Sequence, residues 1–303
     1  MNYHTIPKTD LKVSSSCLGG GMFSVREQLK PTFALLDFFT DKGGNFIDTA
    51  NAYGKWNGKN ENESELAIGQ WLKARKKRDD VVIGTKGCYL NYTTWDNIQL
   101  KRADMTASLE DSLVSLCTDY IDLYWIHADD ETVSIEEILS YMGDFVKQGK
   151  IRYFGCSNMR IERIKEAAEY AKQHGLQSFI ANEVHYSLGY KNKEDIAYHV
   201  ETNLTAIPYS SQAKGLFEKL DKGTATPNTP YYSEENVQLY KRVKKISKET
   251  GLSITQIVLG YIVSQPFLTI PIIGSHTEQQ LADSMSAAET KLSKDILAYL
   301  DSE

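Results

Sequence analysis

The sequence predicts an α/β fold of the (β/α)8 TIM-barrel type, built as a single domain over residues 1–303. Short β-branched and aromatic runs alternate along the chain with amphipathic helical patterns, which is typical of parallel strands joined by crossover helices. The length of 303 residues suits one barrel of eight such units. No linker, low-complexity tract or composition break divides the sequence, so a second domain is not expected.

Eight predicted strands are short runs rich in apolar residues. They cover residues 13–18, 45–48, 81–86, 121–127, 152–157, 179–183, 204–208 and 269–273. Eight predicted helices carry apolar residues three and four positions apart. They cover residues 32–42, 64–74, 101–116, 135–147, 161–174, 195–202, 234–250 and 279–288, and an additional apolar helix is expected at 253–265.

Two local features refine this assignment. Ser64 is expected to cap the helix at 64–74, because a Ser side chain accepts hydrogen bonds from the first backbone N–H groups of a helix. The longest irregular segment, about 220–232, contains Pro227 and Pro230. A loop of that length in a compact barrel is usually functional or mobile, so we expect it to cover the substrate site.

Composition argues against nucleic-acid and membrane partners. The formal net charge is −6, whereas a surface that follows nucleic-acid phosphates needs a concentration of Lys and Arg. The one basic run, residues 73–78, ends a predicted helix, where cations complement the helix dipole. No stretch reaches about 18 consecutive apolar residues, so no membrane span is expected. The four cysteines are widely spaced, which favours free thiols in a reducing, cytoplasmic compartment.

Four polar residues follow strand-like runs in the first half of the chain. Asp48 and Tyr53 lie in GGNFIDTANAYG, Lys86 ends VVIGTK, and His127 ends YIDLYWIH. Because the carboxyl ends of parallel strands meet at one rim of a barrel, we expect these side chains to lie close together. In isolation each has an ordinary structural interpretation, such as a solvated Lys or an Asx turn at Asp48; the combination predicts a carbonyl-reducing centre.

The chemistry assigns a role to each of the four residues. Carbonyl reduction needs a hydride, which no side chain carries, so a nicotinamide cofactor is required. Tyr53 is the expected proton donor, and its phenol titrates near about 10 when free. We expect Lys86 to lower that pKa and Asp48 to hold Lys86 by an ion pair. A neutral His127 would donate an N–H to the substrate oxygen and polarise the carbonyl.

These motifs resemble the aldo-keto reductase family, in the family's order and approximate spacing. Further matches are GKIRYFGCSN, NEVHYS, PYSSQAKGL and IPIIGSHTEQQL, so the similarity runs from about residue 5 to about residue 300. The resemblance implies a cytoplasmic NAD(P)H-dependent oxidoreductase that reduces aldehydes or ketones. Ala128 and Ser211 stand where many members have a larger residue and a proline, which suggests the bacterial-type general reductases.

The resemblance also implies a cofactor site in the second half of the barrel. Ser157 and Asn158 would hold the nicotinamide carboxamide, and Tyr209 would stack on the nicotinamide ring. The pyrophosphate would lie against Ser210, Gln212, Lys214 and Gly215, and the adenosine end against Gly274, Ser275, Thr277, Gln280, Asp283 and Ser284. Barrels commonly bind phosphate after strands seven and eight, which agrees with this placement. No GxGxxG follows the first strand, so a Rossmann dehydrogenase is disfavoured.

Two departures from the family pattern concern the cofactor. Glu183 stands where the family usually has Gln near the carboxamide, and a carboxylate only accepts hydrogen bonds. We hypothesise that Glu183 favours the positively charged oxidised ring or is itself partly protonated. Gly274 and Gln280 align with positions where many NADPH-preferring relatives carry Lys and Arg. The family favours NADPH, and the two uncharged positions lead us to expect use of NADH as well.

The substrate is predicted only as a small carbonyl compound. Loops after the strands would form the pocket walls, and the expected contributors are Met22, Trp56, Tyr89, Tyr231 and Tyr232. Their alternative interpretation is ordinary packing within loops. An aromatic wall suits aldehydes, quinoid compounds or small carbonyls, without naming one.

Two other function classes stay open at this point. One is a redox-sensing regulatory subunit that binds nicotinamide with little turnover, as channel-associated members of the family do. The other is an unrelated barrel, such as a metal-dependent hydrolase or a phosphate-sugar isomerase. The six histidines form no HxH pair at a strand end, so a metal site is not predicted. The oligomeric state is not predicted.

Overall fold

A computed structural model of the chain describes residues 1–25, 29–55, 62–88 and 98–302. Within these ranges eight strands pair in parallel, in the order β10-β3-β4-β5-β6-β7-β8-β9. Their bounds are β3 Cys17–Gly19, β4 Phe46–Asp48, β5 Val82–Gly87, β6 Ile121–Ile126, β7 Ile151–Ser157, β8 Ala181–His185, β9 Thr205–Tyr209 and β10 Ile272–Ile273. The parallel bridge between Ala206 and Thr269 brings the two ends of the sheet together. The chain is therefore a nearly closed barrel, and the predicted fold class is confirmed.

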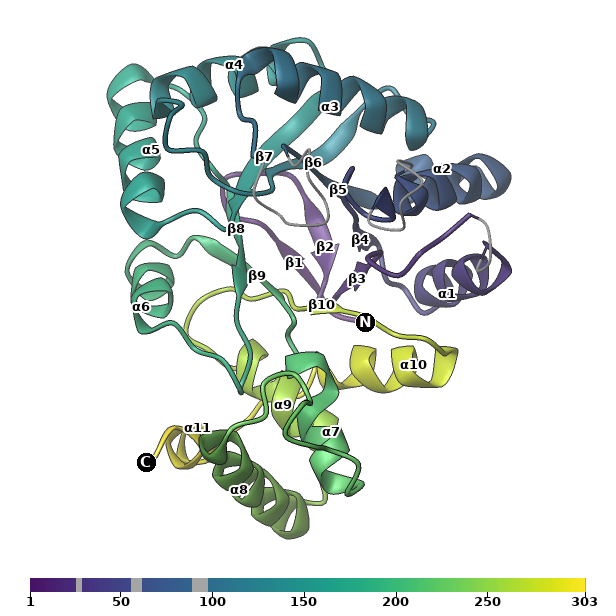
Figure 1. The fold of residues 1–303 in the computed structure, drawn as a ribbon, viewed down its shortest axis with the longest axis vertical. Helices are drawn as coiled ribbons and strands as arrows, with labels where there is room; N and C mark the ends of the chain where they lie inside the picture. Colours follow the sequence, from purple (N-terminus) through teal and green to yellow (C-terminus); the bar gives the residue numbers. More distant parts are fainter. Residues whose placement is uncertain (26–28, 56–61, 89–97, 303) are drawn as a thin grey trace.

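The described helices form a layer around the barrel strands (Figure 1). They are α1 Leu29–Asp41, α2 Glu63–Arg75, α3 Arg102–Ser115, α4 Ile135–Lys147, α5 Ile161–His174, α6 Lys193–Thr202, α7 Leu216–Asp221, α8 Glu234–Thr250, α9 Ile254–Val263, α10 Glu278–Ala287 and α11 Lys294–Asp301. Helices α4, α5 and α8 begin and end at the predicted residues. The short helices α7 and α11 were not predicted from the sequence.

The segment 13–18 is not one strand, as predicted, but parts of two. β2 (Lys12–Ser14) pairs antiparallel with β1 (Tyr3–Thr5), whereas β3 joins the barrel. The chain breaks at the serines between them, because the Ser14 hydroxyl donates to the carbonyl oxygen of Ser16 at 2.8 Å. The hairpin packs Ile6, Leu11 and Val13 against the first residues of several barrel strands. It therefore closes the amino-terminal end of the barrel and leaves the other end for the site.

Ser64 does not cap α2, so that prediction is wrong. The residue before the helix is Asn62, whose side chain makes no capping hydrogen bond. Ser64 instead lies buried inside the first turn, where its hydroxyl donates to the carbonyl oxygen of Gly20 at 2.7 Å and lies 2.7 Å from the Thr49 hydroxyl. This side chain therefore ties α2 to the loops that follow β3 and β4.

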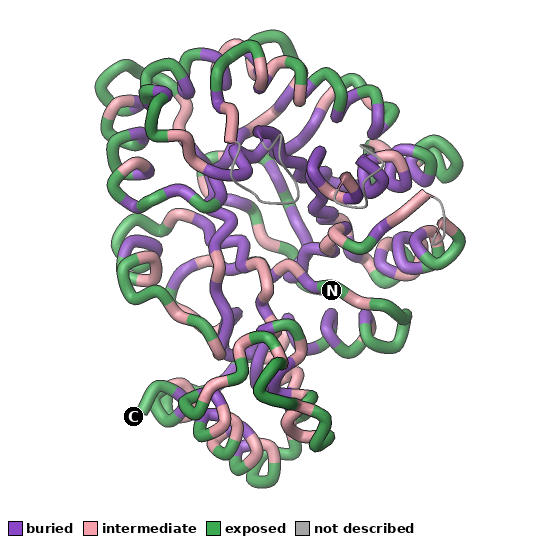
Figure 2. Tube along the Cα trace, in the orientation of Figure 1, coloured by how far each residue is buried: buried purple, intermediate pink, exposed green. Residues whose placement is uncertain are grey.

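Burial follows the barrel arrangement (Figure 2). The barrel strands are largely buried, while the outward faces of the helices are exposed. Cys17, Cys88 and Cys156 are buried free thiols, as predicted, and Cys117 is an exposed free thiol. Among the helices that the structure describes, none has the length and apolar character needed to cross a membrane.

Candidate active site

A fully buried Lys86 lies at the centre of the site. It is near the end of β5, and its ammonium forms an ion pair with the Asp48 carboxylate at the end of β4. The same Nζ donates to the Thr49 carbonyl oxygen at 2.8 Å and to the Tyr53 hydroxyl at 3.3 Å. The Glu183 Oε2 atom, on β8, is 3.3 Å from it. The structure thus brings Asp48, Tyr53 and Lys86 together as the sequence predicts, while their catalytic roles stay predictions.

Burial and charge act in opposite directions on the ionisation of Tyr53 and Lys86. Burial raises the pKa of the Tyr53 phenol, and the charge of Lys86 lowers it only in part. Lys86 thus lowers the pKa of Tyr53 as predicted, but burial outweighs this effect and the net pKa is raised rather than lowered. Burial alone would lower the pKa of Lys86, but Asp48 and Glu183 together hold it well above its ordinary value. Lys86 is thus a permanent cation and Tyr53 a protonated phenol at neutral pH.

His127 follows β6 and faces Tyr53. Its backbone N–H donates to the Gly87 carbonyl oxygen at 3.1 Å, and its ring meets the Tyr53 ring edge-on, with centroids 5.9 Å apart. Burial, helped by the charge of Lys86, lowers the pKa of His127 well below its ordinary value. The imidazole is therefore neutral at physiological pH, which is the state that the sequence-based hypothesis requires.

A second buried polar network holds the loop that carries Tyr53. Asn51 donates to Asp111 at 2.8 Å, and the Glu65 carboxylate accepts from Asn62 at 2.7 Å and from Thr85 at 2.5 Å. Glu65, Asp111 and Thr85 belong to α2, α3 and β5, so three elements hold the loop through side chains that do not line the cavity described below. The sequence analysis did not identify this network, because its members carry no catalytic motif.

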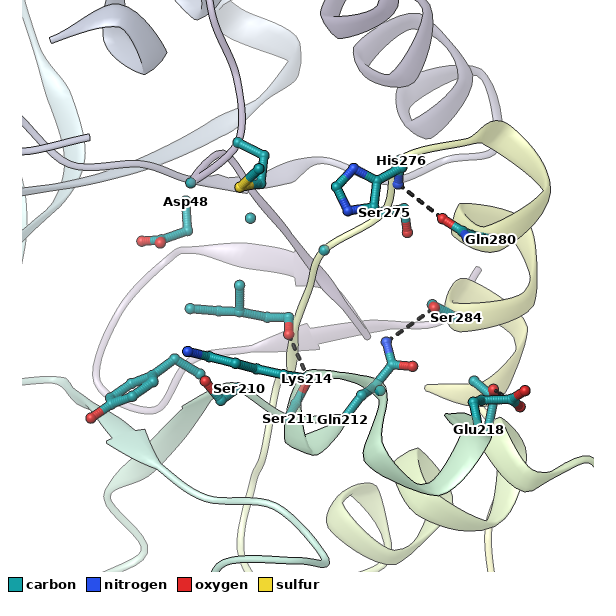
Figure 3. A pocket seen from close by; sticks show the side chains of 18 of the residues that line it. Asp48, Ser210, Ser211, Gln212, Lys214, Glu218, Ser275, His276, Gln280 and Ser284 are labelled. Atoms are coloured by element: carbon teal, nitrogen blue, oxygen red, sulfur yellow. Dashed lines mark hydrogen bonds between the residues drawn. The ribbon is translucent and has the colours of Figure 1, made fainter. Parts of the chain in front are cut away.

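A cavity of about 1190 Å³ opens beside the cluster of Asp48, Tyr53 and Lys86. Asp48, Tyr53, His127 and Glu183 line it, and so do side chains of α7, α9 and α10. In Figure 3 Asp48 lies on one side of this cavity, and Glu218, Gln280 and Ser284 lie on the other. The cavity therefore joins a buried charged centre to an open polar region, which suits an elongated ligand.

Most of the predicted cofactor residues line this cavity. They are Asn158, Glu183, Tyr209, Ser210, Gln212, Lys214, Gly215, Gly274, Ser275, Gln280, Asp283 and Ser284. Ser157 and Thr277 do not line it. The Ser157 hydroxyl accepts from the Asn158 side chain at 3.1 Å, and Thr277 caps α10 by accepting from the Gln280 backbone N–H at 3.2 Å. These two residues thus support neighbours that do face the cavity.

The polar region carries donors that suit the phosphate and ribose oxygens of a nucleotide. Gln212 donates to Ser284 at 3.2 Å across it (Figure 3). The buried Ser275 hydroxyl has no hydrogen-bond partner within the described ranges, although it lines the cavity. Lys214, Lys219 and Lys222 add ammonium groups to the same wall. Hydroxyl, amide and ammonium donors of this kind bind phosphate and ribose oxygens.

Tyr209 is the last residue of β9, and two contacts hold its aromatic ring in place. Its hydroxyl donates to the Asn158 side chain at 2.8 Å, and its ring is stacked with His185 at a centroid distance of 5.0 Å and an angle of 8°. His185 was not predicted from the sequence. The strand period offered a signal, because His185 is two residues after Glu183 and pairs in register with Tyr209.

Some of the residues predicted to contact the substrate line the cavity, and others do not. Met22 lines the cavity, as does Phe23, which was not predicted. Tyr231 and Tyr232 are not among the lining residues. The Tyr231 hydroxyl is instead 2.7 Å from Nε2 of His185, the residue whose ring is stacked with Tyr209. Tyr231 thus anchors the segment after α7 to β8. Trp56 and Tyr89 lie outside the described residues.

Comparison with known proteins gives the family. A model of the aldo/keto reductase family matches residues 17–303. The chain belongs to the aldo/keto reductase family. Its relatives include norsolorinic acid reductase B of Dothistroma septosporum, 27% identical over 97% of this chain and 79% of the relative. An uncharacterized oxidoreductase, YrpG, of Bacillus subtilis is 31% identical over 99% and 95%, and aryl-alcohol dehydrogenase [NADP(+)] of Phanerodontia chrysosporium is 28% identical over 89% and 75%.

Membership in the aldo/keto reductase family makes this protein an oxidoreductase of the kind that acts on small molecules and generally uses a nicotinamide cofactor. Its strand ends carry the charged cluster, as the resemblance implies. Across the described part of this aldo/keto reductase, no group of three or more His, Cys, Asp or Glu side chains is arranged to hold a metal ion.

Proposed function

We propose that the protein is an NAD(P)H-dependent carbonyl reductase that converts aldehydes or ketones to alcohols. The observation that carries this proposal is the contact of the Tyr53 hydroxyl with the Lys86 ammonium, at 3.3 Å, beside a large polar cavity. A reduced nicotinamide, when bound, supplies the hydride that side chains lack. The reductases and dehydrogenases among the relatives support the same class of reaction.

Three side chains act on the carbonyl oxygen in this proposal. Tyr53 keeps its proton at neutral pH, because burial raises the pKa of the phenol, and it donates that proton to the oxygen. Lys86 stabilises the phenolate that remains. Neutral His127 donates a hydrogen bond to the same oxygen as negative charge develops there. Asp48 holds Lys86 in place through the buried ion pair.

The remaining cavity residues bind the cofactor in this proposal. Asn158 holds the carboxamide, Tyr209 supports the ring, and Ser210, Gln212 and Lys214 bind the pyrophosphate. NADPH is the preferred cofactor, which the name of the Phanerodontia chrysosporium relative supports. The uncharged Gly274 and Gln280 support use of NADH as well. Tyr209→Ala is expected to raise the Kd for NADPH about 5- to 30-fold, equivalent to about 1–2 kcal/mol of lost stacking.

The Tyr209 prediction is measured by fluorescence titration. Tyr209→Phe is the matched control, since it keeps the ring and removes only the hydrogen bond to Asn158. We expect its Kd to stay within about threefold of wild type. Equal losses in the Phe and Ala variants would assign the effect to Asn158 rather than to stacking.

Aromatic aldehydes are the expected substrate class. The names of the relatives refer to norsolorinic acid and to aryl alcohols, and Met22, Phe23 and Tyr53 provide apolar surface around the charged cluster. Titration with NADPH and with NADH, followed by addition of an aromatic aldehyde, tests the function. Binding followed by cofactor oxidation supports the reductase. Binding without oxidation of any aldehyde or ketone moves the assignment to a redox-sensing subunit, and absence of binding overturns both.

Activity is expected to be unchanged by EDTA. The proposed chemistry uses Tyr53, Lys86 and His127 without a metal ion, so chelation removes nothing that the reaction needs. The test compares initial rates of aldehyde reduction before and after prolonged dialysis against EDTA. A loss of activity that Zn²⁺ or Mg²⁺ restores would favour the metal-dependent barrel.

Four free cysteines support a reducing compartment such as the cytoplasm.

A further inference from the structure

Glu183 lies in the same buried cluster as Lys86 and Asp48. Its carboxyl is 3% exposed, its Oε2 atom is 3.3 Å from the Lys86 ammonium, and it contacts the Asp48 carboxyl. Two nearly fully buried carboxyl groups therefore face one cation. As carboxylates, Asp48 Oδ1 and Glu183 Oε2 accept no hydrogen bond of normal geometry from a donor in the described residues, although Glu183 Oε2 lies 3.3 Å from the Lys86 ammonium. One proton between the two carboxyl groups supplies that donor and removes the excess negative charge.

The other titratable groups around Glu183 do not carry a compensating charge. Tyr53 is a protonated phenol and His127 is neutral. Cys17, on β3, is also neutral, because burial and the two carboxyl groups raise the pKa of its thiol. The charge of the cluster is therefore decided by the single proton on its two carboxyl groups. Burial, followed by the charge of Asp48, raises the pKa of Glu183 to about 8.

We propose that Glu183 sets the preference of the site for the redox form of the nicotinamide, so that the oxidised cofactor binds with release of a proton. This rests on the proposed function. With the shared proton the cluster is neutral and suits the uncharged reduced ring. Without it the cluster carries one negative charge, which favours the positively charged oxidised ring. The sequence suggests two alternatives for Glu183, a preference for the oxidised ring and partial protonation. In this proposal both hold, because the protonated cluster suits the reduced ring and the deprotonated cluster suits the oxidised ring.

The coupling between proton release and cofactor binding determines how the Kd of the oxidised cofactor changes with pH. If the oxidised ring favours the deprotonated cluster, its Kd falls as pH rises, by up to about tenfold per pH unit, and levels off above about 8. The reduced ring carries no charge, so its Kd is nearly independent of this proton. The phosphates are the same in both forms of the cofactor, so their own titration cancels in the ratio of the two Kd values.

The test measures the Kd of NADP⁺ and of NADPH from pH about 6 to about 9, for wild type and Glu183→Gln. In wild type the ratio of Kd for NADP⁺ to Kd for NADPH is expected to fall at least about tenfold across this range, and in Glu183→Gln to stay flat. Calorimetry in buffers of different ionisation enthalpy counts protons directly. Wild type is expected to release up to one proton per NADP⁺ near pH about 7, and the variant none.

Glu65→Gln is the matched control. Glu65 is a second buried carboxyl whose pKa burial raises, but it bonds to Thr85 and Asn62 and does not line the cavity. Its variant is expected to keep the pH dependence of wild type. A flat ratio in wild type, or a pH dependence that survives Glu183→Gln, overturns the inference while the reductase assignment stands. Failure of both cofactors to bind at every pH overturns the proposed function itself.

Discussion

Replacement of Tyr53 by Phe is expected to lower kcat for aldehyde reduction by about 10²–10⁴-fold or more, with the Kd for NADPH within about twofold of wild type. The variant keeps the ring that packs edge-on against His127 and loses only the hydroxyl that contacts Lys86. In the proposed mechanism this hydroxyl donates the proton in the transition state, so its loss is expected to affect the chemical step and not cofactor binding. Steady-state kinetics and fluorescence titration measure the two quantities separately.

Tyr186→Phe is the control for this experiment. Tyr186 is buried and also has a raised phenol pKa, but it is not among the cavity residues. We expect kcat in this variant to stay within about threefold of wild type. If Tyr53→Phe kept more than about a tenth of the wild-type kcat, another group would be donating the proton, and the assignment of Tyr53 would be abandoned.

The pKa of Tyr53 also predicts how the rate depends on pH. Burial raises this pKa, so the phenol is fully protonated across the neutral range and does not limit reduction there. A change in rate near pH about 8 would therefore belong to the cluster of Asp48 and Glu183. This attribution is checked by the pH profile of kcat in Glu183→Gln, where the change near about 8 is expected to disappear.

The sequence predicted the barrel, and the proximity of the proposed catalytic residues, for physical reasons. Alternating strand and helix patterns leave few topologies, and residues that follow parallel strands meet at one end of a barrel. Asp48, Lys86 and His127 could therefore be placed near one another from the sequence alone. The closing hairpin was missed because Val13, Cys17 and Leu18 were assigned to one strand, although three serines separate β2 from β3.

Contacts between distant strands could not be predicted in the same way. Glu183 was expected near the carboxamide, and its ion pair with Lys86 spans β5 and β8, which are not neighbours in the sheet. Only the closure of the barrel brings these side chains together. Ser64 shows the same limitation, because a tertiary hydrogen bond to Gly20 replaced the local capping role. The pKa of Tyr53 was misjudged because the sequence reveals neighbouring charges more readily than burial.

Replacement of Lys86 by Met is expected to abolish reduction and to lower the free energy of unfolding by about 3–5 kcal/mol at alkaline pH. The variant leaves the Asp48 and Glu183 carboxyl groups buried without the cation that now faces both. Each carboxyl then favours its protonated form in the folded state, so the folded pKa values rise above the unfolded ones. A raised folded pKa contributes stability that is present at low pH and lost as pH rises. Urea denaturation at a series of pH values measures this slope.

The variant that combines Lys86→Met with Asp48→Asn and Glu183→Gln separates the two roles of Lys86. It contains no buried charge at the site, so it is expected to recover most of the lost stability and to show no pH slope from this cluster. It should still be inactive, because nothing stabilises the Tyr53 phenolate. Recovery of stability without activity would mean that the buried charges are retained for catalysis and not for folding. If Lys86→Met were as stable as wild type at alkaline pH, the two carboxyl groups would not depend on Lys86, and the electrostatic account of the cluster would be wrong.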